Sequence, residues 1–231
     1  MNNILSIGII EEYYNIAIYR SSLYQYFSLA FRYPNNDIIT VLKKEQNILL
    51  DGMKYLYHLT SDMDKTLNMF KKTINSIIDI QELQVEYARL FVGPFKLPAP
   101  PYESVYRIES KGFLMGDSTL KVKKMYQEEG LDLPKSTYIL PDHIVVELEF
   151  MAYLAEEEAL TWEKMSEDKA KYYLKKQNTF LTEHLTKWIP QFAKAVYENS
   201  NEEFYCLLAK ITDDFIALDN EFVKTLIEFL D

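Results

Sequence analysis

The amino-acid sequence predicts an all-α protein, and three observations support that fold class. Six of the eight prolines and four of the six glycines fall between Gly93 and Pro141, so the flanking segments contain few residues that interrupt helices. Apolar residues in those flanks recur at steps of three and four, the period of an amphipathic helix. No alternation of apolar and polar residues is long enough to build a sheet.

The 231 residues are enough for one domain with a sizeable core. The prolines and glycines divide residues 1–231 into an N-terminal helical lobe over 1–92, a central connection over 93–141 and a C-terminal helical lobe over 142–231. We therefore expect a single multihelical bundle with a Pro/Gly-rich connection between its lobes.

Five helices are expected in the N-terminal lobe. The first ends before Tyr33-Pro34, because a residue that precedes proline avoids the helical region. Asn36 or Asp37 can cap the second helix, and Ser61 or Asp62 can begin the fourth. In order, the expected helices span residues 9–32, 37–50, 53–59, 62–77 and 80–92.

Four helices are expected in the C-terminal lobe. One shorter helix precedes them, from Asp117 or Ser118 to about Glu129, where Gly130 can end it. Pro190 marks a break or a first turn. The helix that starts at residue 142 is the most apolar, so we expect it at the centre of the bundle. In order, the expected helices span residues 142–164, 167–188, 191–198 and 202–231.

The net charge of −10 is confined to one half of the chain. Residues 1–116 carry 12 basic and 12 acidic side chains, whereas residues 117–231 carry 13 and 23. This acidity disfavours nucleic acid and anionic membranes as partners and favours a basic partner. No run approaches the ~20 apolar residues that span a bilayer, and the N-terminus lacks the features of a signal peptide. A cytoplasmic protein without stable membrane insertion is therefore expected.

Known catalytic motifs are missing from the sequence. The single cysteine, Cys206, excludes an internal disulfide and a cysteine-rich metal site. There is no Gly-x-Ser-x-Gly, no Gly-x-x-x-x-Gly-Lys-Ser/Thr and no Gly-x-Gly-x-x-Gly. We therefore expect neither an enzyme nor a bound cofactor.

A first candidate site is the stretch from Glu86 to Tyr106, EYARLFVGPFKLPAPPYESVY. It begins as the end of a helix, which Gly93-Pro94 terminates, and continues as a stiff segment with three more prolines and few backbone donors. A rigid apolar segment bordered by aromatic side chains can form the wall of a groove. The alternative is a proline-braced connection whose aromatics fill the core.

A second candidate site runs from Pro141 to Met151, PDHIVVELEFM. His143 and Glu147 are four residues apart, so they share a helix face and could bind a divalent metal together. Two ligands do not make a metal site. The alternative is that Asp142 caps the helix while His143 and Glu147 form an intrahelical pair.

Together, these stretches resemble the signatures of the TorD/DmsD family. The resemblance lies in the residue types, order and spacing of RLFVGPFKLPAPPYESVY, GFLMGDST and PDHIVVELEFMAYLAEEE, over about residues 82–158. Members of that family are cytoplasmic chaperones that mature molybdenum-containing redox enzymes. The resemblance implies a TorD-like fold, either monomeric or a domain-swapped dimer. It also implies the twin-arginine signal peptide and the apo form of a molybdoenzyme as partners.

Carried over residue by residue, the resemblance also implies a peptide groove. Its lining and rim would be formed by Tyr87, Leu90, Phe91, Phe95, Pro101, Tyr102, Ser104, Pro141, Asp142, His143 and Glu147. Relatives often carry tryptophan where this chain has tyrosine or phenylalanine. The run LPAPPYESVY favours a client of the dimethyl sulfoxide or trimethylamine N-oxide reductase type.

A twin-arginine signal carries two adjacent arginines followed by a moderately apolar segment. A binder therefore needs an apolar trough and carboxylates that accept hydrogen bonds from guanidinium groups. The central stretch can supply the trough, and Asp142, with Glu147 or Glu149, can supply the carboxylates. Two other hypotheses are a metal-dependent hydrolase that uses His143 and Glu147, and an adaptor that binds amphipathic helices regardless of the arginine pair.

Overall fold

The computed structural model describes residues 7–94, 96–108, 112–134 and 139–231, and it confirms the all-α fold class. Within these ranges there is no strand, and the extended backbone pairs only at an isolated antiparallel bridge between Tyr102 and His143. No helix in the described ranges has both the length and the apolar character needed to cross a membrane.

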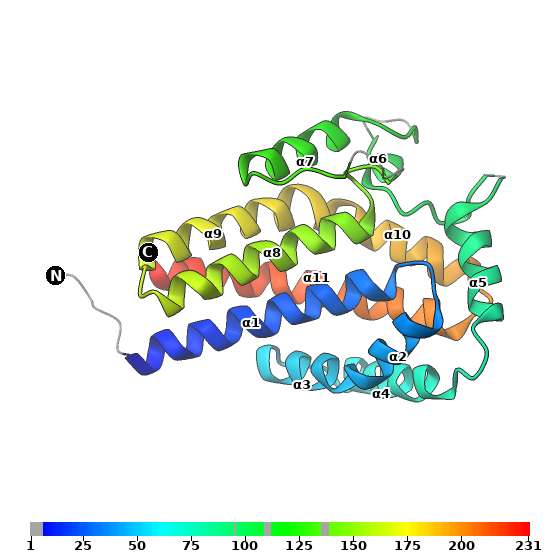
Figure 1. Cartoon of the computed structure of the whole chain (residues 1–231), viewed down its shortest axis with the longest axis horizontal. Coiled ribbons are helices and arrows are strands. Elements are labelled where there is room, and N and C mark those ends of the chain that lie inside the picture. The colour runs from blue at the N-terminus through cyan, green and yellow to red at the C-terminus, as the bar shows by residue number, and fades with distance from the viewer. Residues whose placement is uncertain (1–6, 95, 109–111, 135–138) are drawn as a thin grey trace.

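Four long helices run side by side through the centre of the bundle (Figure 1). They are α1 (Ile7–Ala30), α8 (Ile144–Glu163), α9 (Glu167–Phe180) and α11 (Glu203–Leu230). Helix α1 packs most extensively against α8, although the two helices belong to opposite halves of the sequence. Helix α8 is buried on nearly all sides, in agreement with its apolar sequence.

The remaining helices cover two sides and one end of this centre (Figure 1). Helices α3 and α4 pack on α1 and α11, and α10 also packs on α11. A π-helical segment, η1, continues α5 at the end of the bundle. The bounds are α2 (Asn36–Lys44), α3 (Gln46–Leu56), α4 (Ser61–Ser76), α5 (Gln81–Tyr87), η1 (Ala88–Val92), α6 (Glu103–Tyr106), α7 (Asp117–Glu128), η3 (Leu181–Leu185) and α10 (Thr186–Asn199).

Most of the predicted elements are confirmed, but several boundaries differ from the prediction. The segment predicted as one helix to residue 50 is broken at Glu45, and α3 continues through Gly52. Gly52 lies inside α3 because a Cβ atom there would approach the side chain of Leu23 at 3.3 Å. The cap of α2 is Asn35, one position before the earliest predicted cap, whereas α4 begins at Ser61 as predicted, with Thr60 as its cap.

The region around Pro190 also differs from the prediction. The proline lies inside α10, which starts at Thr186 directly after η3. In η3 the backbone has already left the regular α-helical hydrogen-bond pattern. A proline near the first turn of the following helix therefore does not end it.

A fully buried ionic cluster, which we call the core network, ties the central helices together. Arg20 of α1 donates to both carboxylate oxygens of Asp219 of α11, at 2.6 and 2.9 Å, and to Glu158 of α8 at 3.1 Å. The hydroxyls of Tyr24 and Tyr57 donate to Asp219 at 2.5 and 2.8 Å. Glu158 in turn accepts hydrogen bonds from the side chains of Gln177 and Trp162. Every carboxylate oxygen in this network has a donor, as a buried charge requires.

Candidate functional site

Main-chain hydrogen bonds join the two candidate stretches at one place, which we call the junction. Ile144 N donates to Pro101 O at 3.0 Å, and Glu103 N donates to Asp142 O at 2.9 Å. Tyr126 of α7 donates from its hydroxyl to Pro141 O at 2.9 Å and so holds α7 against the same place. The two stretches, which are far apart in the sequence, therefore form one structural unit.

His143 caps α8, so the prediction that Asp142 caps this helix is wrong. The backbone is extended at His143, whose Nδ1 accepts a hydrogen bond from Val145 N at 3.1 Å. Its ring meets the ring of half-buried Tyr102 edge to face, at 4.9 Å between centroids. Burial lowers the pKa of His143 to about 4, so the ring is neutral at physiological pH and its nitrogen can accept the hydrogen bond.

Asp142 is fully buried and caps α6, which lies in the other stretch. Its Oδ2 accepts a hydrogen bond from Ser104 N at 2.9 Å, and Ser104 is itself buried. Asp142 Oδ1 has no hydrogen-bond partner among the described residues. With no exposed surface, Asp142 cannot contact an added peptide in this conformation.

Two more buried carboxylates complete what we call the junction cluster. Glu147 Oε2 accepts a hydrogen bond from Trp188 Nε1 at 2.8 Å, and Glu103 Oε2 lies 2.9 Å from His184 Nδ1. Arg107 forms an ion pair with Glu103 at 3.3 Å. Like Asp142, both glutamates have no exposed surface. The predicted pairing of Glu147 with His143 is therefore wrong, because each has a different partner.

The surroundings of Glu147 oppose a negative charge on its carboxyl group. Burial raises the pKa of Glu147 well above its usual value, and the nearby carboxyl group of Glu103 raises it further. Both effects favour the protonated form of Glu147. As a neutral acid it can donate a hydrogen bond towards Glu103 while it accepts one from Trp188.

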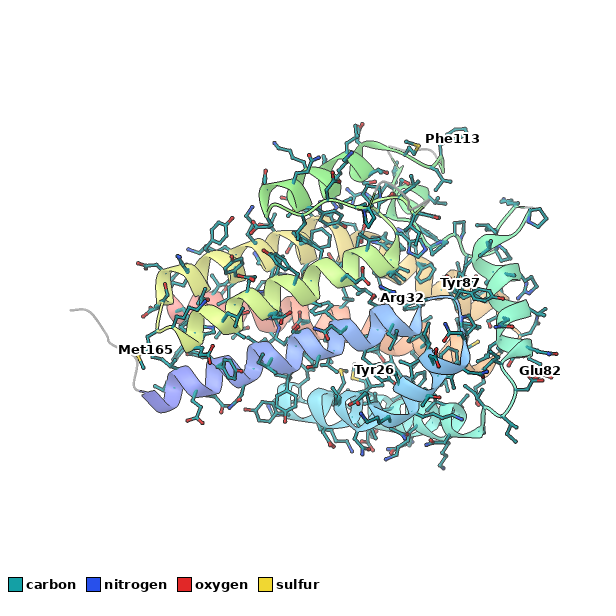
Figure 2. The ribbon with its side chains drawn as sticks, in the orientation of Figure 1. Tyr26, Arg32, Glu82, Tyr87, Phe113 and Met165 are labelled. Carbon is teal, nitrogen blue, oxygen red and sulfur yellow. The ribbon has the colours of Figure 1, made fainter. Side chains whose placement is uncertain are left out.

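Three of the predicted groove residues face the core. Tyr87, Leu90 and Phe91 are buried on α5 and η1. The Tyr87 hydroxyl donates to Phe31 O at 3.2 Å, and burial raises its pKa to about 12. In Figure 2, Tyr87 lies on the side of α5 that faces the bundle. For these three residues the core alternative describes the structure, so none of them lines an open groove.

The other predicted residues have mixed positions. Pro101 is buried, Pro141 is half-buried, and Phe95 lies outside the described residues. An open trough of about 370 Å³ lies instead on the outer face of η1 and the following turn. Its lining is Ala88, Arg89, Val92, Gly93, Pro94, Lys96 and Pro98. The central stretch therefore does offer a mainly apolar hollow. However, the residues that line it are neighbours of the predicted residues in the sequence and not the predicted residues themselves.

The sequence prediction did not include Glu103, His184 or Trp188, which complete the junction cluster. Glu103 carried a local signal, because it stands four residues before Arg107 and directly after the proline run. His184 and Trp188 carried none, since only the packing of η3 and α10 brings them to the junction. Among the described residues, no group of three or more histidine, cysteine or acidic side chains is arranged to hold a metal ion.

Comparisons with known proteins agree with the resemblance of the two stretches. The family model described as nitrate reductase delta subunit matches residues 58–194. The chaperone protein TorD of Photobacterium profundum is 28% identical over 210 residues, which cover 88% of this chain and 94% of the relative. The Tat proofreading chaperone DmsD of Salmonella typhi is 28% identical over 138 residues, 57% of each chain.

A solved structure supports the same assignment at the level of the fold. It is a crystal structure assigned as a redox enzyme maturation protein from Archaeoglobus fulgidus, 27% identical, with a TM-score of 0.56. The superposition covers 86% of this chain and 93% of the other. The matched family model, the chaperone relatives and this fold together show that the chain belongs to the nitrate reductase delta subunit family, and within it to the TorD/DmsD family of non-enzymatic chaperones for redox enzyme maturation.

Proposed function

We propose that this chaperone binds the twin-arginine signal peptide of a molybdenum-containing oxidoreductase in the cytoplasm. The client is of the dimethyl sulfoxide or trimethylamine N-oxide reductase type. By covering the signal, the chaperone holds the apo-enzyme back from export until its cofactor has been inserted.

The observation that carries this proposal is the apolar trough on η1, at the start of the central signature stretch. Val92 is 60% exposed there, and the prolines that follow cannot offer backbone donors to water. An exposed apolar hollow on a rigid wall suits the moderately apolar segment that follows the arginine pair. Chain relatives named as chaperones point to a protein client for that hollow.

The predicted site residues then act mainly by holding this wall in place. Tyr87, Leu90 and Phe91 anchor α5 and η1 from inside the bundle. At the other end of the stretch, Tyr102 and His143 pack together at the junction. The junction is fixed in the same way by Pro101, Ser104, Pro141, Asp142 and Glu147. Phe95 lies outside the described residues and stays a predicted peptide contact on the resemblance alone.

A calorimetric titration with two synthetic peptides tests the function. One peptide is the twin-arginine signal of a candidate client, and the other has both arginines replaced by alanine. Tight binding that weakens without the arginines is expected. Equal binding of both peptides would favour the general helix-binding adaptor, and binding of neither would contradict the proposal. The metal-dependent hydrolase hypothesis gains no support from the separate partners of His143 and Glu147.

Light scattering on the same samples would report the oligomeric state. A monomer and a domain-swapped dimer are both compatible with a hinge in the central connection over residues 93–141. Because the trough lies within one chain, we expect one peptide bound per chain in either state.

A further inference from the structure

A hollow of about 410 Å³, which we call the furrow, lies where the end of α4, the start of α5 and the start of α11 meet. Leu83 and Phe204 form a buried apolar floor, and Ile78 stands 99% exposed at the edge. The complete lining is Thr73, Ser76, Ile77, Ile78, Asp79, Glu82, Leu83, Glu202, Glu203 and Phe204. The furrow is therefore both apolar and open to solvent.

Carboxylates supply all of the formal charge in the furrow. Asp79, Glu82, Glu202 and Glu203 line it, and none of the described lining residues is basic. Glu203 accepts a hydrogen bond from the Thr73 hydroxyl at 2.7 Å. No lysine or arginine in the described ranges forms an ion pair with these four carboxylates, although carboxylates elsewhere on the surface are paired, such as Asp64 with Lys54.

The carboxylates in the furrow also repel one another. Partial burial raises the pKa of Glu202, and the charges of Glu82 and Glu86 raise it further. Glu86 is already neutralised by Arg89, through two hydrogen bonds of 2.7 and 2.8 Å. A cation placed between Glu82 and Glu202 would relieve the remaining repulsion. The furrow is therefore complementary to a positively charged group.

An exposed strip connects the furrow to the trough. Glu82, Val85, Ala88 and Val92 follow one another at steps of three, three and four along α5 and η1, so they share one outer face. Val85 is 70% exposed. In Figure 2, Glu82 points outward at the end of the bundle, away from Tyr87 on the inner side of the same helix.

The length and order of this surface match a twin-arginine signal. Ten helical residues separate Glu82 from Val92, which at ~1.5 Å each is about 15 Å. An extended peptide covers that length with about five residues. A segment with its arginines in the furrow would therefore place the following apolar residues on Val85 and then in the trough.

We propose that the furrow binds the arginine pair of the signal peptide, which then runs along the outer face of α5 and η1 into the trough. The inference rests on the proposed function and adds the place and direction of binding. It assigns the arginines to exposed, unpaired carboxylates, because Asp142 and Glu147 have no accessible surface and already accept hydrogen bonds. Guanidinium groups form charge-assisted hydrogen bonds with carboxylates without a large desolvation cost at such a half-open site.

The double substitution Glu82→Gln with Glu202→Gln tests this placement in the full chain. Both positions have solvent-accessible side chains, so circular dichroism and thermal unfolding should match the wild type. We expect the variant to bind the twin-arginine peptide about tenfold more weakly, while its affinity for the alanine peptide does not change. The difference between the two peptides should therefore largely disappear.

A matched control removes the same charge elsewhere. Glu156→Gln with Asp168→Asn changes two exposed carboxylates that belong to α8 and α9, outside the furrow lining. This control should bind both peptides like the wild type at physiological salt, where long-range attraction is largely screened. Asp142→Asn should also keep the wild-type affinity for both peptides.

The outcomes separate this inference from the proposed function. If the wild type prefers the arginine peptide and the double variant retains the full preference, the furrow is not the arginine site. Loss of that preference in Asp142→Asn would return the arginines to the junction and overturn the inference. If the wild type binds neither peptide, the proposed function fails and the inference fails with it.

Discussion

The core network and the junction cluster are both fully buried groups of charged side chains, yet they are built differently. In the core network, the Arg20 guanidinium stands between Asp219 and Glu158, and both carboxylates accept several hydrogen bonds. In the junction cluster, Asp142 Oδ1 and Glu147 Oε1 accept none from the described residues. Every carboxylate oxygen of the core network therefore has a donor, whereas the junction cluster has more carboxylate oxygens than donors.

This difference indicates what each cluster does for the chaperone. Because every carboxylate oxygen of the core network accepts a hydrogen bond, the network fixes the relative positions of α1, α8 and α11, and these helices can shift little without breaking those bonds. In an acceptor-rich cluster the excess of acceptors is offset by backbone donors such as Ser104 N and by protonation of a carboxyl group, which burial favours at Glu147. The contribution of the core network to stability should therefore change little with the pH of the solution, whereas the contribution of the junction should change with it.

Removal of Arg20 should have the largest effect. Arg20→Ala leaves Asp219 and Glu158 buried without their cation, which should lower the free energy of unfolding by about 3–5 kcal/mol. Chemical denaturation measures the loss. Arg32→Ala is the control, because Arg32 pairs with Glu149 at the surface and its loss should cost less than about 1 kcal/mol. Similar losses for both variants would contradict a special role of the core network.

The second largest effect should be the loss of stability at low pH that results from protonation of His143. Its folded pKa of about 4 lies below the ordinary 6.5, so its contribution to stability is present above pH 6.5 and is lost as the pH falls through 4. The full loss is on the order of 3 kcal/mol. His143→Asn keeps a capping side chain but does not titrate, so its unfolding free energy should fall less between pH 7 and 4. If the unfolding free energies of variant and wild type fell equally between pH 7 and 4, this explanation would be wrong.

Asp142 should show a smaller effect that depends on the replacement. Asp142→Ala removes the acceptor for Ser104 N and should cost about 1–2 kcal/mol. Asp142→Asn keeps an acceptor oxygen and should cost only a few tenths of a kcal/mol. Thermal unfolding of the two variants under one buffer makes the comparison. If asparagine were as damaging as alanine, the charge of Asp142 would matter more than its cap.

Substitution of Glu147 by glutamine should change the unfolding free energy least. At neutral pH the change should be zero or stabilising, whereas the substitutions above destabilise. Because its pKa is raised in the folded state, its contribution to stability is present below the ordinary value of 4.5 and is lost as the pH rises above it. Glu147→Gln mimics the protonated acid, so we expect unfolding free energies at pH 7 to 8 equal to or above those of the wild type. Glu147→Ala is the contrast, since it leaves Trp188 Nε1 unpaired. A clear destabilisation by glutamine would show that Glu147 is charged when folded.

The fold could be predicted largely because helices carry a local signal. The apolar period and the missing breakers located α1, α8 and α11 to within a few residues. The break at Glu45 could not be predicted, because no proline or glycine marks it. The place of Gly52 inside α3 could not be predicted either, because its close packing on Leu23 is a property of the assembled bundle.

The meeting of the two candidate stretches could be predicted from the sequence, but the burial of their side chains could not. The two stretches do meet at the junction, as their shared resemblance predicts. However, the pattern that places Tyr87, Leu90 and Phe91 on one helix face fits a core as well as a groove, and only packing decides between them. The burial of Asp142 could not be predicted from the sequence either, because its hydrogen-bond partner, Ser104, lies in a separate stretch.

The bridge at Tyr102 and His143 has a consequence for how such chaperones diversify. The bridge and the neighbouring main-chain hydrogen bonds hold together the two ends of the segment between Ser104 and Pro141, and α7 packs this segment back on the bundle through the buried side chains of Val122 and Tyr126. The entropy cost of closing a loop grows only slowly with its length, so insertions or deletions in a loop with fixed ends change the free energy of folding very little. We therefore expect relatives to differ in the length of the connections on either side of α7, while the buried side chains of α7 and the packing of α8 against α1 are retained.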